Sequence, residues 1–385
     1  MVMGKVSFIG FLIILLGAIS TAGAVSVENL EKLTLSETNI WDPVLSPDGT
    51  RIAYVSYNTP QDPMTPLNQT IFVINADGTG KKAITSDNLK KWGLAWGPDK
   101  LAYVSFGKDG LEKIFVINPD GTDNHQLILD NTRQGSAAED KPPTWSAPSW
   151  SPDGKTLVYT SLDEIGDQKM YMANSDGTGK KLIFKDNFKQ WSPYISPDGK
   201  NIVYVSYNDR YKEELFIIDI PGTARKQITF DEIKKNYPVW GPAGTITYVS
   251  YESITSSGEK IFAINQDGTN KRLFVDSDYK QRSPSFNSDG RRFAYAAIDS
   301  SGAVKIAVGS VAGVAVETPT TVPTLATTTP TTPAVTSASP TPAHTPETTE
   351  GPALKDVVST MILVLGIIVI VMVILLVLSD IISKK

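Results

Sequence analysis

Residues 45–57 read LSPDGTRIAYVSY, and this stretch decides the fold because the chain repeats it. Five variants follow, such as WSPDGKTLVYTS at residues 150–161, and they begin at Trp96, Trp150, Ile195, Trp240 and Phe286. Successive copies are 45 to 54 residues apart when measured at the positions equivalent to Pro47, which are Pro98, Pro152, Pro197, Pro242 and Ser288. Six copies at this period indicate an array of small supersecondary units.

A second marker follows the first in five copies. Residues 71–79 read IFVINADGT, and related stretches begin at Ile114, Met170, Leu215 and Ile261. Both markers are short runs of β-branched and aromatic residues bounded by Pro, Asp and Gly turn signals, and neither shows a helical period. Each copy therefore predicts four strands. Four-stranded units repeated six times predict an all-β fold, a six-bladed β-propeller over residues 25–316.

The sixth copy ends before its DGT turn and its fourth strand. The missing strand has a counterpart near the N-terminus, where Lys32-Leu33-Thr34-Leu35 matches the outer-strand pattern of the complete copies. We therefore expect residues 30–36 to supply the outer strand of the last blade, which closes the ring and protects a strand edge.

In the first marker of each copy, the sequence resembles the WD40-like repeats of TolB-type propellers. Their hallmark is Pro-x-Trp-Ser-Pro-Asp-Gly, and PSWSPDGKTLVYTS at residues 148–161 and SPYISPDGKNIVYVS at residues 192–206 fit it. The resemblance covers nearly all of residues 25–316 and implies the propeller fold. Propellers of this kind include partner-binding modules and domains of peptidases, so the fold alone does not name a function.

The two ends of the chain carry targeting signals. Residues 1–24 have a basic start, an apolar run and small residues before a cleavage site, which predicts a secretory signal peptide. Residues 357–378 contain no charge and reach about 33 Å as a helix, enough to cross a bilayer core of about 30 Å. Lys384 and Lys385 follow this span, so we expect a single-pass type I membrane protein with residues 379–385 in the cytoplasm and the propeller outside.

Residues 317–353 change to a composition of Thr, Pro, Ala and Ser with almost no large apolar side chain. This composition predicts a disordered, extended stalk that holds the propeller away from the membrane. The chain has one glycosylation sequon, at Asn68, in a long loop of the first copy.

Composition excludes several kinds of chemistry. The 385 residues include no Cys and two His, so disulfides, thiolate metal sites and multi-histidine metal sites are excluded. Neither His125 nor His344 lies where a catalytic base would be needed, and no nucleophile motif occurs, so we expect no enzyme activity, cofactor or metal. The net charge of −5 argues against nucleic acid as a partner.

Aligning the copies upstream of the proline marker gives the candidate site. The aligned positions precede the innermost strand of each blade, so their side chains are expected to gather at one mouth of the central channel. Aromatic rings beside amino groups would suit a glycan or a protein segment from the cell envelope. The predicted ligand-binding residues are Trp41, Trp92, Trp191, Tyr237, Lys90, Lys91, Lys189, Lys234, Lys235, Lys280 and Arg282.

Two alternatives remain open. The first is an enzyme of carbohydrate or peptide processing that uses channel carboxylates, for which Asp87, Asp186 and Asp231 recur at one spacing. The second is a structural component of a surface layer. Unpaired carboxylates in a deep channel would favour the enzyme, whereas lateral contacts between copies would favour the layer.

Overall fold

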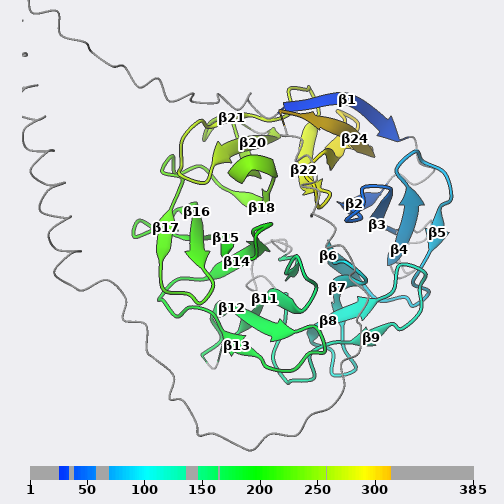
Figure 1. Cartoon of the computed structure of the whole chain (residues 1–385), viewed down its shortest axis with the longest axis vertical. Coiled ribbons are helices and arrows are strands. Elements are labelled where there is room, and N and C mark those ends of the chain that lie inside the picture. Colours follow the sequence, from blue (N-terminus) through cyan, green and yellow to red (C-terminus); the bar gives the residue numbers. More distant parts are fainter. Residues whose placement is uncertain are drawn as a thin grey trace, which may run out of the picture. The chain divides into compact units, whose positions relative to one another are not determined.

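The described residues of the computed structural model form a ring of small sheets around a common centre (Figure 1). They comprise residues 26–33, 39–57, 69–135, 146–163, 165–256 and 258–313. Within them the strands form six four-stranded antiparallel sheets, which we call blades one to six in chain order. The prediction of an all-β, six-bladed propeller is therefore confirmed.

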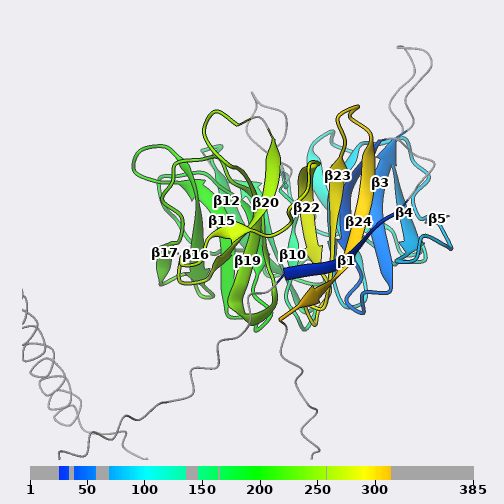
Figure 2. The ribbon, with the colours of Figure 1, turned by 90° about the horizontal axis from the view of Figure 1, so that it is seen from above.

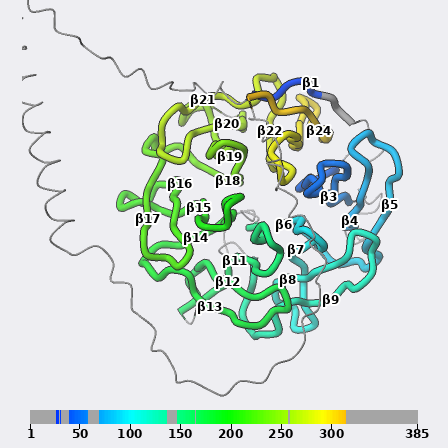
Figure 3. The backbone as a smooth tube through the Cα atoms, in the orientation of Figure 1, coloured from blue at the N-terminus to red at the C-terminus, as the bar shows by residue number. Residues whose placement is uncertain are grey.

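The first three blades run from the centre outward in sequence order, as the backbone trace shows (Figure 3). Blade one contains β2 (Ile40–Leu45), β3 (Arg51–Tyr57), β4 (Gln69–Asn75) and β5 (Lys82–Ala83). Blade two contains β6 (Lys91–Trp96), β7 (Leu101–Phe106), β8 (Glu112–Ile117) and β9 (His125–Gln126). Blade three contains β10 (Ser149–Trp150), β11 (Thr156–Leu162), β12 (Gln168–Asn174) and β13 (Lys181–Leu182).

The next two blades follow the same order. Blade four contains β14 (Gln190–Ile195), β15 (Asn201–Tyr207), β16 (Glu213–Asp219) and β17 (Arg225–Gln227). Blade five contains β18 (Asn236–Trp240), the 3-10 turn η1 (Pro242–Gly244), β19 (Thr245–Tyr251), β20 (Glu259–Asn265) and β21 (Arg272–Leu273).

Blade six is assembled from both ends of the propeller sequence. Its inner strands are β22 (Lys280–Phe286), β23 (Arg292–Ile298) and β24 (Val304–Ala312), and its outer strand is β1 (Ser26–Leu33). The predicted closure by an N-terminal strand is confirmed, although the strand lies earlier than residues 30–36. The register pairs Ser26 with Ala312 and Leu33 with Ile306.

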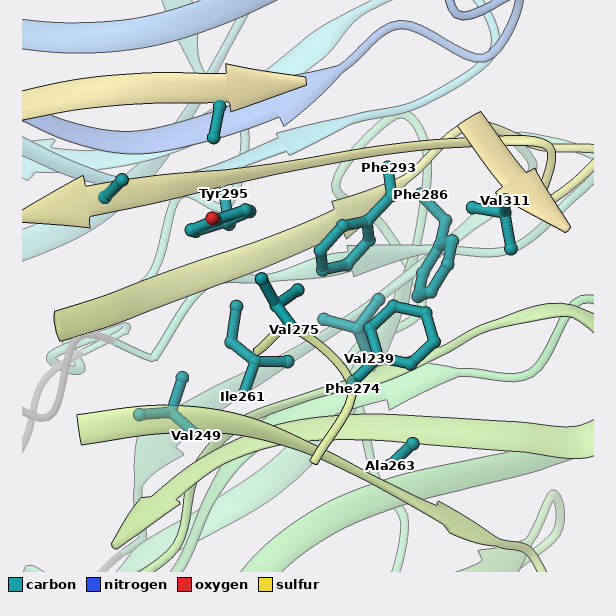
Figure 4. Close-up of a cluster of buried hydrophobic side chains, with 12 residues drawn as sticks. Val239, Val249, Ile261, Ala263, Phe274, Val275, Phe286, Phe293, Tyr295 and Val311 are labelled. Atoms are coloured by element: carbon teal, nitrogen blue, oxygen red, sulfur yellow. The ribbon is translucent and has the colours of Figure 1, made fainter. Parts of the chain in front are cut away.

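Apolar side chains between neighbouring blades hold the ring together. The described residues form six hydrophobic clusters, and each lies between two adjacent blades. The cluster between blades five and six contains Phe274, Phe286 and Phe293, whose rings pack at centroid distances of 4.8 to 5.8 Å (Figure 4). Burial of such aromatic side chains is the main favourable term in blade packing.

A buried tyrosine recurs in the second strand of every blade. The six residues are fully buried, and in five blades the ring packs against an aromatic residue directly opposite on the third strand, as Tyr54 does on Phe72 at 5.6 Å. The motif AYVS or its equivalent thus marks the same packing position in each copy, at Tyr54, Tyr103, Tyr159, Tyr204, Tyr248 and Tyr295.

The strand directions define two ends of the propeller. We call one end the loop face: it carries the connections into the innermost strands and those between second and third strands (Figure 2). Its described residues are 39, 84–90, 107–111, 127–135, 146–148, 163, 165–167, 183–189, 208–212, 228–235, 252–256, 258, 274–279 and 299–303. Because β24 runs away from this face and pairs antiparallel with β1, Ser26 and Ala312 lie together at the opposite end.

Several predictions fall on residues that the structure does not describe. Among the described residues, no helix has the length and apolar character needed to cross a bilayer. The signal peptide at 1–24, the glycosylation sequon at Asn68, the stalk at 317–353, the membrane span at 357–378 and the tail at 379–385 all lie outside the described residues. They remain predictions.

Candidate functional site

The innermost strands enclose a central cavity of about 120 Å³. One residue from each blade, five positions before the turn marker, forms a ring in its wall. Most members of this ring are small, and the exceptions are an aspartate and a tyrosine. The ring consists of Asp42, Gly93, Ala147, Ser192, Tyr237 and Ser283.

The backbone of this ring is irregular in a repeated way. In five blades the innermost strand shifts register at the ring residue, which is a β-bulge. Asp42, Ser192, Tyr237 and Ser283 have φ values of 49° to 50°, in the left-handed region that favours glycine. Four non-glycine residues around the same cavity thus have a backbone conformation that costs free energy.

Asp42 is the charged residue in the wall of this cavity. Its side chain is 8% exposed. One carboxylate oxygen accepts the Gly93 amide N–H at 2.9 Å, and the other accepts the Ser283 hydroxyl at 3.1 Å. Burial raises the pKa of Asp42, while these two hydrogen bonds and the charge of Arg282 act in the opposite direction.

The Asp42→Asn variant is expected to gain stability relative to the wild type as pH rises. A carboxyl whose pKa is raised above 3.8 in the folded state contributes stability below that pH and loses it as pH rises through the folded pKa. The amide cannot ionise, so the difference in unfolding free energy should shift in favour of the variant as pH rises above 3.8. Urea unfolding of both proteins measures this difference, and a difference that does not change with pH would contradict it.

The predicted rim lysines differ in burial. Lys91 and Lys235 are buried, Lys189 is partly buried, and Lys90, Lys234 and Lys280 are exposed. The Lys91 ammonium donates to the backbone oxygens of Gln69 at 3.0 Å and Leu89 at 2.8 Å and pairs with Asp87. Burial lowers its pKa, and Asp87 opposes that shift. The expectation that Lys91 faces a ligand is therefore wrong, because its ammonium is enclosed by the loop that precedes its strand.

Lys235 is enclosed in the same way. Its ammonium lies 2.9 Å from a carboxylate oxygen of Glu214, with both side chains fully buried, and it also pairs with Asp231. The pair closes the connection between blades four and five. Lys235 is thus unavailable to a ligand, and we correct that prediction too.

Other blades hold the same loop from a different strand. In blades two, three and five, Lys113, Lys169 and Lys260 on the third strand donate to backbone oxygens of the connection to the next blade. After two of these blades, three and five, the residue equivalent to Lys91 is a glutamine. Gln190 accepts the Met170 amide N–H and Gln281 accepts the Ile261 amide N–H, both from the third strand. A lysine therefore binds the backbone of the connection between two blades in either of two ways: from the start of the innermost strand, as Lys91 and Lys235 do, or from the third strand.

Two of the three predicted rim tryptophans also lie inside. Trp92 is 6% exposed and packs between blades two and three, and Trp191 is 4% exposed and packs between blades four and five. They are not the exposed aromatic faces that we expected. Trp41 is partly buried, and the Arg282 guanidinium lies 5.9 Å from its ring while also pairing with Glu259.

The remaining predicted lysines include two that share a groove. Lys189 and Lys234 line a groove of about 570 Å³ on the loop face around blade four. Phe188 and Tyr211 add aromatic walls, and their rings meet edge to face with centroids 5.8 Å apart. Tyr211 is 75% exposed, which is unusual for a side chain of this size.

The charge of this groove is mixed rather than cationic. Its lining includes three lysines, Lys189, Lys212 and Lys234, and three acidic residues, Asp167, Glu213 and Glu232. An aromatic groove with both signs of charge matches the composition of protein interfaces better than that of a site for an acidic glycan.

Exposed apolar side chains concentrate on the same face. Among the described residues, seven large hydrophobic side chains are exposed, and six of them lie in loop-face connections. The six are Leu89, Leu129, Ile165, Tyr211, Phe230 and Ile254. The seventh, Leu273, lies on the outer strand β21. Sequence reasoning missed this set because each residue is alone in its loop, and only the ring brings the loops to one end.

The carboxylates of the enzyme alternative lie in the connections between blades and not in the cavity wall. Asp87 pairs with Lys91, and Asp231 pairs with both Lys235 and Lys271. Asp186 lies 3.7 Å from Lys169 and from Arg225. Sequence reasoning did not single out Asp42, although its position in the repeat, where four of the other five copies have a small residue, was a usable signal.

The Asn-x-Asp-Gly-Thr turns hold their own backbone. The Asp77 carboxylate accepts the Thr79 amide N–H at 2.9 Å and its hydroxyl at 2.7 Å, and the same bonds recur in three further blades. Among the described residues, no three carboxylate or histidine side chains are grouped as metal ligands.

Comparisons with known proteins agree with the architecture. TolB from Acinetobacter baumannii is 20% identical with a TM-score of 0.52, over 70% of this chain and 66% of that one. Putative TolB from Agrobacterium tumefaciens is 15% identical with a TM-score of 0.50, over 74% of this chain and 98% of that one. At these identities the likeness shows the fold alone. This chain thus spans just under two thirds of the Acinetobacter protein.

A comparison with curated proteins found no match. The model of the TolB beta propeller domain family matches residues 26–245, which is more than half of the chain. Together with the repeat and the six closed blades, this match shows that the chain belongs to the TolB beta propeller domain family.

Proposed function

We propose that this protein is a noncatalytic binding module of the cell envelope and that its loop face binds a protein partner. The observation that carries the proposal is the concentration of six of the seven exposed large apolar side chains on that face. Soluble proteins usually keep such side chains dispersed, and a set gathered on one surface is typical of an interaction site.

The groove beside these side chains fits the same purpose. Phe188 and Tyr211 offer aromatic surface, which contributes most to binding at protein interfaces, and three lysines and three carboxylates surround it. A polar margin around an apolar centre excludes water and selects a partner of complementary charge. A glycan remains the other candidate, because aromatic rings beside amino groups also suit sugars.

The ends of the propeller support its presentation at a surface. Ser26 and Ala312 are paired at the end opposite the loop face, so the chain enters and leaves the ring there. The predicted stalk at residues 317–353 and anchor at residues 357–378 follow Ala312 in the chain. We propose that they attach the propeller to the outside of the cell by a single membrane span.

Membrane attachment has a direct test. The full chain is expected to stay in the membrane pellet after alkaline carbonate extraction, whereas a chain that ends at Pro352 is expected in the supernatant. Release of the full chain under the same conditions would contradict an anchor at residues 357–378.

Binding by the loop face is tested by capture from envelope extract of the source cells and on a glycan array. The full chain in detergent is compared with the double variant Tyr211→Ser, Phe230→Ser. Both residues are more than 70% exposed, so the thermal midpoint should stay within a few degrees while partner capture falls about tenfold or more.

Leu273→Ser is the matched control, because it also replaces an exposed apolar residue but lies on β21. It should capture the partner as the wild type does. Equal capture by all three proteins would contradict the proposal. Loss of glycan binding without any loss of protein binding in the double variant would transfer the proposal to a glycan.

A further inference from the structure

The wall of the central cavity combines one charged group with apolar and aromatic surface. Asp42 is its carboxylate, and Trp96, Trp150, Tyr237 and Phe286 are among the residues that line it. Water and backbone dipoles normally stabilise a carboxylate, and here burial removes most of the water. A carboxylate in such a setting is a strong acceptor for an entering positive charge.

The charge of Asp42 is not neutralised by an ion pair within the described residues. Its two hydrogen-bond donors, the Gly93 amide and the Ser283 hydroxyl, are both neutral. Arg282 is near enough to act on it electrostatically, but the Arg282 guanidinium is committed to Glu259 and lies over Trp41. Within the described residues, no cationic side chain therefore forms an ion pair with the Asp42 carboxylate.

Packing alone does not explain an aspartate at this position. The equivalent residues are Gly, Ala, Ser, Tyr and Ser, and at the seam between blades three and four a serine at the preceding position, Ser146, accepts the next blade's Ser192 amide N–H at 3.0 Å. A neutral hydroxyl can thus make the bond that Asp42 makes to Gly93. Asp42 instead combines a buried charge with a φ of 49°, and such costs gather at functional sites.

We propose that the central cavity binds one small cationic group, a primary ammonium or a guanidinium, through the Asp42 carboxylate. The volume of about 120 Å³ approaches that of an engineered cavity of about 150 Å³ that accepts benzene, so a group of about six non-hydrogen atoms fits. Ammonium and guanidinium groups also bind favourably to aromatic walls, whereas Ca²⁺ and Mg²⁺ require six or more oxygen ligands.

This site is separate from the groove on the loop face, so it goes beyond the proposed function and does not depend on it. The cation has two possible sources, a free amine or a basic side chain of a bound protein. Both present the same chemistry to Asp42, and the experiment distinguishes them.

The test titrates the full chain in detergent with n-butylamine at about pH 7, where an alkylamine is protonated. Tryptophan fluorescence is the readout, because Trp96 and Trp150 line the cavity. 1-Butanol is the neutral control ligand of similar shape. An acetylated, amidated Ala-Lys-Ala peptide supplies the same amine on a chain.

Butylamine, the peptide or both should bind saturably, and butanol should bind about tenfold or more weakly, since a hydrogen bond between two charged groups is stronger than one from a neutral hydroxyl. Tighter binding of the peptide would identify a protein side chain as the source, and tighter binding of butylamine would identify a free amine. Asp42→Asn should lose about tenfold or more in affinity for the amines and keep its weak affinity for butanol.

Asp289→Asn is the matched control, because it removes one exposed carboxylate from a turn at the other end of the strands. It should bind as the wild type does. Thermal melting of both variants confirms that they are folded. The proposal is overturned if neither amine binds, if butanol binds as tightly as the amines, or if a folded Asp42→Asn variant binds them with unchanged affinity.

Discussion

Replacing Lys235 by alanine is expected to lower the free energy of unfolding by about 3–5 kcal/mol, since removal of one partner leaves an uncompensated buried charge. The Lys235 ammonium lies 2.9 Å from Glu214, and both side chains are fully buried. Asp231 and the backbone oxygen of Ile233 also accept from this ammonium. Its loss should therefore loosen the connection between blades four and five.

Lys234 is the matched control because it is the adjacent residue and is exposed. Lys234→Ala should change the free energy of unfolding by no more than about 0.5 kcal/mol. Urea denaturation followed by tryptophan fluorescence measures both variants. Equal effects of the two substitutions would contradict the assignment of Lys235 to the interior and return it to the candidate ligand-binding residues.

Removal of β1 should have a comparable effect on the whole ring. Val27 and Leu30 pack against the cluster between blades five and six, and apolar side chains of this size contribute up to about 1.5–3 kcal/mol each when buried. A chain without residues 26–33 also exposes the edge of β24. We expect unfolding at clearly lower urea concentration, with a loss of about 3 kcal/mol or more.

A point variant gives an independent test of this closure. A Cβ atom at Gly309 would lie 2.8 Å from the Glu28 backbone oxygen and 2.8 Å from a methyl group of Val27. Gly309→Val should therefore displace β1 and lower the urea midpoint, whereas Gly302→Ala, in the turn before β24 with open space around it, tests only the cost of its positive φ. An unchanged midpoint in both the deletion and the Gly309 variant would contradict closure by β1.

The repeat was enough to predict the number of blades but not the bounds of the closing strand. The outer strands β5, β9, β13 and β21 are two residues long, so a match between Lys32-Leu33 and their pattern carries little information about register. In the structure the register follows from β24, which is nine residues long and pairs with β1 as far back as Ser26. A bulge between Glu28 and Glu31 shifts the alternation further.

The candidate site was harder to predict because a bulge interrupts the alternation of side chains at the start of the innermost strand in five blades. One inserted residue reverses which later side chains face the channel. The sequence therefore predicted the right segment but assigned Trp92 and Trp191 to the rim, whereas they pack between blades. Asp42, one residue after Trp41, is the one that faces the cavity.

The lysines illustrate a second limit of sequence reasoning. Lys91 and Lys90 are neighbours and look alike in the repeat, yet one is enclosed and the other is exposed. The distinguishing signal lies elsewhere in the chain. Where the lysine is enclosed, as at Lys91 and Lys235, a threonine follows the outer strand of the preceding blade. This threonine, Thr85 or Thr229, accepts an amide N–H of the third strand. In other blades a glutamine accepts that N–H.

The central claim, that the loop face is the binding surface, is tested most directly by crosslinking in living cells. A photo-crosslinking amino acid is placed at Tyr211, at Phe230 or at Leu273 in the full chain, since all three are exposed and only the first two lie on the loop face. The account predicts a discrete crosslinked species from positions 211 and 230 and none from position 273. Crosslinking from position 273 alone, or equally from all three positions, would contradict it.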